Sequence, residues 1–440
     1  KKSKSTAAGD GINKAEAARR ASLQRVSSKK KKKVSHDKTE TVVVVIASLA
    51  VLIGIAYLVL SSPPVPPPKR TKFESKIPDN NETRDPDAPL IIGGYLPDYR
   101  SSIDLDDSVE YLTDLMLFSL ELKEDELDIS DDGENKGCCV NEDMFELARD
   151  IKLEAKLMMD DADQIRENDE LRVLLTVGGG GRSDGFSSLT ASKEKRQKFI
   201  EDLKALCIRE NIDGVDFNWE LPTSQEDVMN YALLIIGVAN EFHASGLIVT
   251  LALHPQQPFP SQAFQFIDRI HLMTYDMISS LPKGEESYGH HASFEKTVAA
   301  VDELTKHNCP AHKIVIGIPA YARNAKSPLH VKTYSEIVDG IMEDEEEGAV
   351  PSLAEFWNVK SYHEYMFDSP SDVARKVRFA RDRGLGGVFF WELGQDKRVD
   401  GGGGFLLEAA GITLEVDRED KSTAPDGDEG GEETPDKSEL

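Results

Sequence analysis

The stretch Asp213-Gly214-Val215-Asp216-Phe217-Asn218-Trp219-Glu220 alternates polar and apolar side chains, which is the pattern of a β-strand with two different faces. One face is polar: Asp216, Asn218 and Glu220. The other face is apolar: Val215, Phe217 and Trp219. A buried polar row is costly unless its groups are hydrogen-bonded or functional. We therefore expect the apolar face to pack under helices and the polar face to point into a barrel. Glu220, last on this strand, would be a general acid; a structural polar network is the alternative.

Seven more short apolar runs flank this stretch, with amphipathic helical patterns such as Lys193–Ile208 and Phe294–Lys306 between most of them. The runs are Leu90–Tyr95, Leu115–Leu120, Arg172–Val177, Leu247–Leu253, Ile270–Tyr275, Lys313–Pro319 and Gly386–Glu392. Eight strands alternating with helices over about 325 residues predict an α/β fold, a (β/α)8 TIM barrel rather than a doubly wound sheet. Such barrels place their chemistry at the carboxyl ends of the strands.

Short motifs occur at the predicted strand ends in a characteristic order. They are Gly94-Tyr95, Phe118-Ser119, Thr176-Val177-Gly178-Gly179, Met273-Thr274-Tyr275-Asp276, Gly317–Arg323 and Gly386–Glu392. With the stretch at 213–220, they resemble the pattern of glycoside hydrolase family 18, the chitinases and chitinase-like proteins. The family's fourth strand carries DGxDxDxE, and Asn218 replaces its third Asp. The resemblance covers most of residues 90–415 and implies the same barrel.

The resemblance also implies a reaction in which the substrate's own 2-acetamido group is the nucleophile. Glu220 would protonate the glycosidic oxygen and later activate water, and Asn218 would orient the acetamido N–H. Tyr275 and Asp276 would hold the acetamido carbonyl and the ring. The catalytic residues implied are Asp216, Asn218, Glu220, Tyr275 and Asp276.

The resemblance implies that Trp391 forms a flat apolar floor under the reacting sugar. The other implied substrate-binding residues are Tyr95, Phe118, Met273 and Arg323. No metal or organic cofactor is implied, and His254, His290 and His291 lack metal-ligand spacing. The partners expected are chitin or other glycans that contain N-acetylglucosamine.

Asn218 is the departure that bears on activity. A carboxylate there would stabilise a cationic intermediate and disfavour ionisation of the neighbouring acid, whereas Asn keeps the shape without the charge. Losing one such contact typically costs about 2–4 kcal/mol, roughly a hundredfold in rate. Because Glu220 is retained, we expect a slow or specialised hydrolase of β-1,4-linked N-acetylglucosamine. The alternatives are a non-catalytic chitin-binding lectin, an endo-β-N-acetylglucosaminidase acting on N-glycans, and a membrane-tethered scaffold.

The amino-terminal fifth of the chain differs from the predicted barrel in composition. The 440 residues carry a formal net charge of -27, which argues against nucleic-acid binding, yet residues 1–40 hold 13 Lys/Arg against 4 Asp/Glu. We expect 1–40 to be a disordered basic cytosolic tail. Residues 41–60 have no charge and would span roughly 30 Å as a helix, so we expect a transmembrane signal anchor in the lipid bilayer. A buried core helix and a cleaved signal peptide are the alternatives.

The remaining segments complete the expected organisation. Residues 61–88 would be a Pro-rich linker, 89–416 the catalytic barrel and 417–440 a disordered acidic tail. The basic flank of 41–60 predicts a single-pass type II protein with a lumenal or extracellular barrel. The ending Lys437-Ser438-Glu439-Leu440 resembles a KDEL-type retrieval signal, which predicts retention in the endoplasmic reticulum unless the ending arose by chance.

Overall fold

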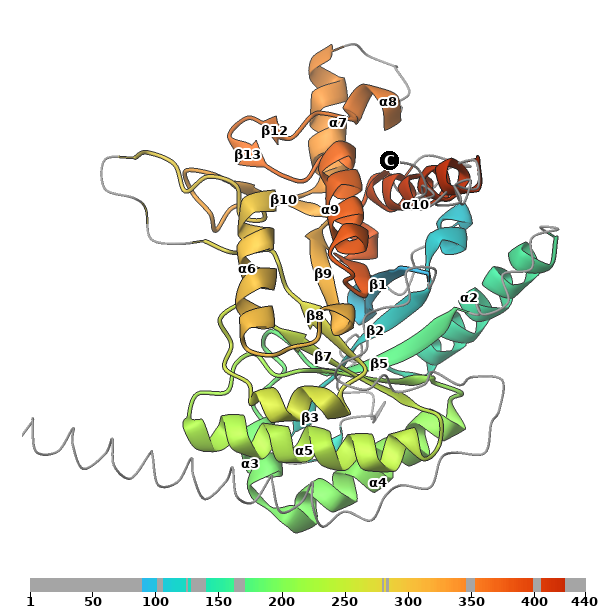
Figure 1. The fold of residues 1–440 in the computed structure, drawn as a ribbon, viewed down its shortest axis with the longest axis vertical. Coiled ribbons are helices and arrows are strands. Elements are labelled where there is room, and N and C mark those ends of the chain that lie inside the picture. The colour runs from blue at the N-terminus through green and yellow to red at the C-terminus, as the bar shows by residue number, and fades with distance from the viewer. Residues whose placement is uncertain are drawn as a thin grey trace, which may run out of the picture. The chain divides into compact units, whose positions relative to one another are not determined.

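The described part of the chain is a closed barrel of parallel strands. The computed structural model describes residues 89–100, 106–123, 126–127, 140–161, 171–278, 281, 285–345, 353–398 and 405–423, all within a compact unit spanning residues 67–440. Around the barrel the strands follow the order β1-β2-β5-β6-β7-β8-β9-β14 (Figure 1). They are β1 (Ile91–Pro97), β2 (Asp114–Leu120), β5 (Arg172–Gly178), β6 (Gly214–Asn218), β7 (Ile248–Leu253), β8 (Arg269–Leu272), β9 (Ile314–Pro319) and β14 (Gly387–Trp391). The predicted (β/α)8 barrel is confirmed, and each predicted run overlaps one strand.

Helices follow the strands, and several begin at a serine that caps the first turn. They are α2 (Glu142–Asp161), α3 (Phe186–Ala191), α4 (Lys193–Arg209), α5 (Gln225–His243), α6 (Phe294–Lys306), α9 (Pro370–Asp382) and α10 (Phe405–Thr423). The side chains of Ser192, Ser224, Ser293 and Ser369 accept backbone N–H groups at the starts of α4, α5, α6 and α9. The helical patterns at 193–208 and 294–306 are thus confirmed as α4 and α6. Helix α10 continues past residue 416, where we expected the barrel to end.

The two faces of β6 lie in different environments, as its alternation predicts. Val215 and Phe217 are fully buried in the large apolar cluster between barrel and helices. A second, smaller cluster fills the barrel interior: Tyr95, Met116, Phe118, Leu174, Met273, Tyr275, Ala292, Val315, Tyr321 and Phe389. Asp216 bonds to side chains of β1, β5, β7 and β8, which places the polar face inside the barrel. The strand ends at Asn218, so Glu220 lies two residues beyond it rather than last on it.

The chain between β9 and α9 forms an α+β insertion beside the barrel. Its sheet is antiparallel in the order β11-β10-β13-β12, and Figure 1 shows two helices grouped with it. Its elements are β10 (Tyr321–Asn324), β11 (Val331–Thr333), α7 (Tyr334–Glu345), α8 (Leu353–Phe356), β12 (Ser361–Tyr362) and β13 (Tyr365–Met366). Other short elements are the β3–β4 ladder (Leu122–Lys123, Glu126–Leu127) and 3-10 turns at Asp98–Arg100, Asp106–Tyr111, Ser261–Phe266, Ala311–Lys313 and Leu393–Gln395. Since β10 follows β9 directly, the insertion starts at the carboxyl end of the barrel.

Several predicted segments lie outside the described residues. These are the basic tail at 1–40, the apolar segment at 41–60, the linker at 61–88 and the last residues, 424–440, with the Lys-Ser-Glu-Leu ending. Within the described ranges, none of the helices has both the length and the apolarity needed to cross a bilayer.

Candidate active site

A cavity of about 250 Å³ opens at the carboxyl ends of the barrel strands. Most of the residues predicted for the site line it: Tyr95, Phe118, Asn218, Glu220, Met273, Tyr275, Asp276 and Trp391. It is also lined by residues that we did not expect in the site: Tyr99, Gly180, Arg182, His254 and Tyr321. Two expected residues, Asp216 and Arg323, lie outside this lining and act on it from behind, as described below.

Asp216 is fully buried at the base of the polar row and is held by four side chains. It accepts hydrogen bonds from Tyr95 Oη (2.7 Å), Thr250 Oγ1 (2.6 Å) and Thr176 Oγ1 (3.3 Å), and His271 Nδ1 lies 3.0 Å from its Oδ1. Burial alone would raise the pKa of Asp216, but the electrostatic and hydrogen-bond contributions of His271 and the bonds from Thr250 and Tyr95 lower it below its ordinary value. Asp216 is therefore a fixed carboxylate beneath the cavity.

Asn218 and Glu220 form the upper part of the row. Asn218 is 2% exposed, and its Nδ2 donates to Glu220 Oε1 at 2.9 Å. Asn218 Oδ1 is buried and has no hydrogen-bond partner among the described residues, which leaves an acceptor at the cavity wall. The backbone N–H of Glu220 donates to Ser183 Oγ at 3.1 Å, while its side chain is 25% exposed. The row thus ends in a carboxyl group that can meet a ligand.

Two glycines at the end of β5 make room for this arrangement. Gly178 and Gly179 have φ of +90° and +110°, a region that L-residues with side chains rarely adopt. A Cβ on Gly178 would lie 2.4 Å from the carbonyl oxygen of Asn218, and one on Gly179 would lie 2.3 Å from the Phe118 ring. The Gly-Gly pair therefore lets the β5 end pass close to both a site residue and a wall of the cavity.

Asp276 follows β8 and is clamped by side chains from the insertion. Tyr321 Oη donates to its Oδ1 at 2.7 Å, and Arg323 donates to both of its oxygens through Nε and Nη2. Burial would raise the pKa of Asp276, but the bonds from His291, Arg323 and Tyr321 lower it well below its ordinary range. Arg323, which we expected to bind substrate, is placed behind Asp276 and fixes its orientation.

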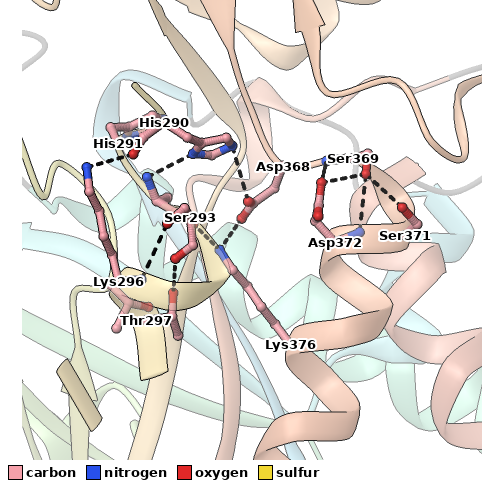
Figure 2. A network of polar contacts seen from close by, with 12 residues as sticks. His290, His291, Ser293, Lys296, Thr297, Asp368, Ser369, Ser371, Asp372 and Lys376 are labelled. Carbon is pink, nitrogen blue, oxygen red and sulfur yellow. Dashed lines mark hydrogen bonds and ion pairs between the residues drawn. The ribbon is translucent and has the colours of Figure 1, made fainter. Parts of the chain in front are cut away.

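A buried polar network holds the loop that carries His290, His291 and Ala292, and His291 lies beside Asp276 (Figure 2). His291 Nδ1 lies 3.2 Å from Asp276 Oδ1, and its ring stacks on that of His290 at 5.5 Å between centroids. His290 Nε2 lies 3.7 Å from Asp368 Oδ1, and Asp368 forms a fully buried ion pair with Lys376 of α9. Lys376 also donates to the carbonyl of Ala292 at 2.8 Å. Helix α9 thereby anchors the loop that positions Asp276.

Several aromatic rings line the cavity and pack against one another. Trp391 lies at the end of β14, with ring centroids 5.3 Å from Tyr95 and 4.7 Å from Phe118. Tyr275 packs edge-on against Tyr321 and Phe389. Burial and the nearby Glu220 raise the pKa of Tyr275 well above its ordinary value, so its hydroxyl stays protonated. The site combines an acid, a clamped carboxylate, a phenol donor and an apolar platform.

Comparison with known proteins points to one family. The sequence model of glycosyl hydrolases family 18 matches residues 92–396, from the first barrel strand to just beyond the last. The chain belongs to this family. Among curated relatives, "Probable chitinase 2" of Drosophila melanogaster is 23% identical over 289 residues, which cover 52% of this chain and 57% of the fly protein. "Chitinase 1" of Aphanocladium album is 26% identical over 274 residues, covering 53% of this chain and 64% of the fungal protein.

Solved structures of a chitinase and of a chitinase-like agglutinin share the barrel. The class V chitinase of Nicotiana tobaccum superposes with a TM-score of 0.58 at 21% identity, covering 74% of this chain and 99% of the tobacco chain. The chitinase-like agglutinin of Robinia pseudoacacia superposes with a TM-score of 0.56 at 22% identity, covering 73% and 99%. At such identities the likeness establishes the fold. Since the chain spans about six tenths of the length of those curated relatives, its activity is argued below from its own site.

Proposed function

We propose that the chain is a hydrolase of β-1,4-linked N-acetylglucosamine and acts by a substrate-assisted, retaining mechanism. The observation that carries this proposal is the partly exposed Glu220 carboxyl in a cavity that Trp391 and the clamped Asp276 also line. The relatives' names support it, because both curated relatives are named as chitinases. A tobacco class V chitinase was also solved in complex with NAG4.

The proposed first step breaks the glycosidic bond without an enzyme nucleophile. The acetamido oxygen of the substrate forms a bond to C1 as the bond from C1 to the leaving oxygen breaks. The leaving oxygen takes the proton of Glu220, so the products are an alcohol, an oxazolinium ion and the Glu220 carboxylate. Water then attacks C1 from the vacated side, gives a proton back to Glu220 and reopens the ring, which retains the configuration.

The other site residues would orient and stabilise the acetamido group in these steps. The unpartnered Asn218 Oδ1 is an acceptor for the acetamido N–H, and the protonated hydroxyl of Tyr275 is a donor for its oxygen. The Asp276 carboxylate supplies negative charge near the developing cation, and Trp391 offers a flat face to the sugar. Fixed groups of this kind lower the barrier because they need no reorganisation during the reaction.

Asn218 supports the proposal that the enzyme is slow, and it also favours a second candidate function, that of a lectin. Its amide orients Glu220 but provides no charge for the oxazolinium ion, so a rate roughly 30-fold to a hundredfold below that of an Asp-containing site is expected. A lectin that binds the same glycans without cleaving them is the second candidate. It is favoured by this missing charge, and the fold is shared with a protein named as an agglutinin.

The test compares wild type, Glu220→Gln and the surface control His307→Gln on a fluorogenic N-acetylchitooligosaccharide. We expect turnover by wild type and His307→Gln, and none by Glu220→Gln. If all three release fluorophore at the same low rate while binding the oligomer equally well, the hydrolase proposal is wrong and the lectin stands. Mass spectrometry of products from chitin oligomers and from a high-mannose glycopeptide then distinguishes chitin from N-glycan as substrate.

We also propose that residues 41–60 anchor the protein in a membrane with the barrel on the lumenal or extracellular side. The support is the uncharged apolar run and the basic flank before it. Alkaline extraction should leave the full chain in the membrane pellet, and a deletion of 41–60 should release it. Deleting residues 437–440 should move the protein out of the endoplasmic reticulum if the ending is a retrieval signal.

A further inference from the structure

The two carboxyl oxygens of Glu220 have different neighbours. Oε1 accepts from the uncharged Asn218 amide at 2.9 Å. Oε2 faces an imidazole, because His254 Nε2 lies 3.8 Å away. Gly180 keeps the space beside Oε2 open, because a side chain at this position would place its Cβ 3.3 Å from that oxygen. A titratable ring therefore stands beside the acid on the side opposite Asn218.

A hydrogen bond fixes the backbone of His254, whereas its ring is partly exposed to solvent. It directly follows β7, which pairs with β6, so the ends of the two strands are neighbours at the cavity. Gln257 Oε1 accepts from its backbone N–H at 3.4 Å, and Gln257 Nε2 donates to the carbonyl of Trp219 at 3.3 Å. The ring is 34% exposed, and within the described part of the chain Glu220 is its one polar side-chain contact.

The other charged groups that line the cavity or lie beneath it already have partners. The Asp276 carboxylate is paired with Arg323, and the Asp216 carboxylate with His271. Arg182, which enters from the loop after β5, pairs with Asp98 at 2.9 Å. Among the titratable groups that face His254 across the cavity, which also include the phenols of Tyr95, Tyr99, Tyr275 and Tyr321, Glu220 is the one within ion-pair distance.

We propose that His254 is a positioning residue of the acid–base centre, whose Nε2–H stabilises the carboxylate that Glu220 becomes on giving up its proton. The proposal rests on the proposed hydrolase function. Closing the gap to hydrogen-bond distance requires a shift of about 1 Å, and catalytic hydrogen bonds are often longer in unliganded sites than in substrate complexes. With Asn218 on one oxygen and His254 on the other, the carboxylate stage has a donor at each oxygen, and His254 adds a positive charge when protonated.

The proposal requires two protonated groups before cleavage: Glu220 holds its proton, and His254 is an imidazolium. During cleavage, the Glu220 proton moves to the leaving oxygen, and the new carboxylate forms a charge-assisted bond with the imidazolium. When water attacks, Glu220 regains a proton from that water, and His254 keeps its own throughout. The imidazolium is thus neither consumed nor produced in a turnover, and it acts through Glu220 alone.

The test uses the full chain and compares wild type, His254→Gln, His254→Ala and the exposed control His307→Gln. Gln keeps a polar side chain of similar length but cannot carry the charge. We expect kcat of His254→Gln to fall about tenfold to a hundredfold with KM changed less than about threefold, as for an interaction made in the transition state. His307→Gln should match wild type, and added imidazole should partly restore His254→Ala.

The pH profile separates this role from a purely structural one. If the protonated forms of both Glu220 and His254 are needed, log kcat/KM of wild type falls on the alkaline side with a limiting slope near two, and that of His254→Gln with a slope near one. An unchanged kcat and profile in His254→Gln overturns the proposal, as does a rise in KM alone. If wild type and Glu220→Gln are equally inactive, the hydrolase function has failed instead, which is a distinguishable outcome.

Discussion

Asn218→Asp places a carboxylate where an amide now donates to Glu220 Oε1 at 2.9 Å. The substitution changes almost no volume, so its effect on the reaction reports charge. The new carboxylate would lie close to the cation that forms during cleavage, and it would also favour the protonated form of Glu220 that donates to the leaving group. Both effects act in the same direction, so we expect kcat to rise.

The size of the effect can be estimated from the site. Unit charges about 4 Å apart attract by about 4 kcal/mol at an effective dielectric constant near 20. The 25% exposure of the Glu220 side chain shows that solvent reaches the site, which screens part of this attraction. We therefore expect a gain of about 2 kcal/mol, or roughly 30-fold in kcat.

The assay is steady-state turnover of a fluorogenic N-acetylchitooligosaccharide by wild type, Asn218→Asp and Asn218→Ala, with melting temperatures measured in parallel. Asn218→Ala removes the donor to Glu220 without adding charge and should lower kcat. If Asn218→Asp folds normally and shows no gain, the missing charge does not limit the reaction, and the electrostatic account given for Asn218 is refuted.

Three further predictions concern groups around the site. Arg323→Met removes a two-point ion pair from Asp276 and should lower kcat about tenfold or more, measured by the same assay, whereas an unchanged kcat would remove Asp276 orientation from the mechanism. Lys376→Met leaves the buried Asp368 carboxylate without its ammonium partner and should lower the unfolding free energy in urea by about 3–5 kcal/mol, part of which should return on adding Asp368→Leu. Burial raises the pKa of Asp396 to about 6 in the folded protein. The unfolded value is about 3.9, so the stabilisation linked to its protonation is present below about pH 4 and is lost as the pH rises through about 6. Asp396→Asn should reduce this decline by up to about 3 kcal/mol, and parallel stability curves for the two proteins would count against it.

The barrel could be predicted because the order of polar and apolar residues within each strand indicates which face is buried against what. Polar and apolar side chains alternate from Val215 to Asn218, and the two faces are in fact buried in different places. The end of the strand could not be read in the same way. The β6 ladder stops at Asn218, and the backbone N–H of Glu220 bonds to Ser183 Oγ instead, a contact between segments far apart in sequence.

His254 was missed in the site and Arg323 was given another role for the same physical reason, because each acts on a residue far away in the chain. His254 is a single histidine after a strand, and it matters because β6 and β7 are neighbours in the closed barrel. Its position directly after the predicted strand Leu247–Leu253 was the available signal. The strands of the insertion are two to four residues long, too short for a periodic pattern, so nothing in the sequence placed Arg323 behind Asp276.

The clamp on Asp276 limits how the wall of the cavity can be exchanged. Tyr321 and Arg323 are the first and third residues of β10, so the segment that begins the insertion also fixes a carboxylate of the barrel. A chimaera could replace the insertion with a longer or shorter one from another protein. Its new segment would have to supply equivalents of both Tyr321 and Arg323, because otherwise Asp276 would lose the bonds that orient it. A change in the insertion therefore alters the shape of the cavity and the orientation of Asp276 together.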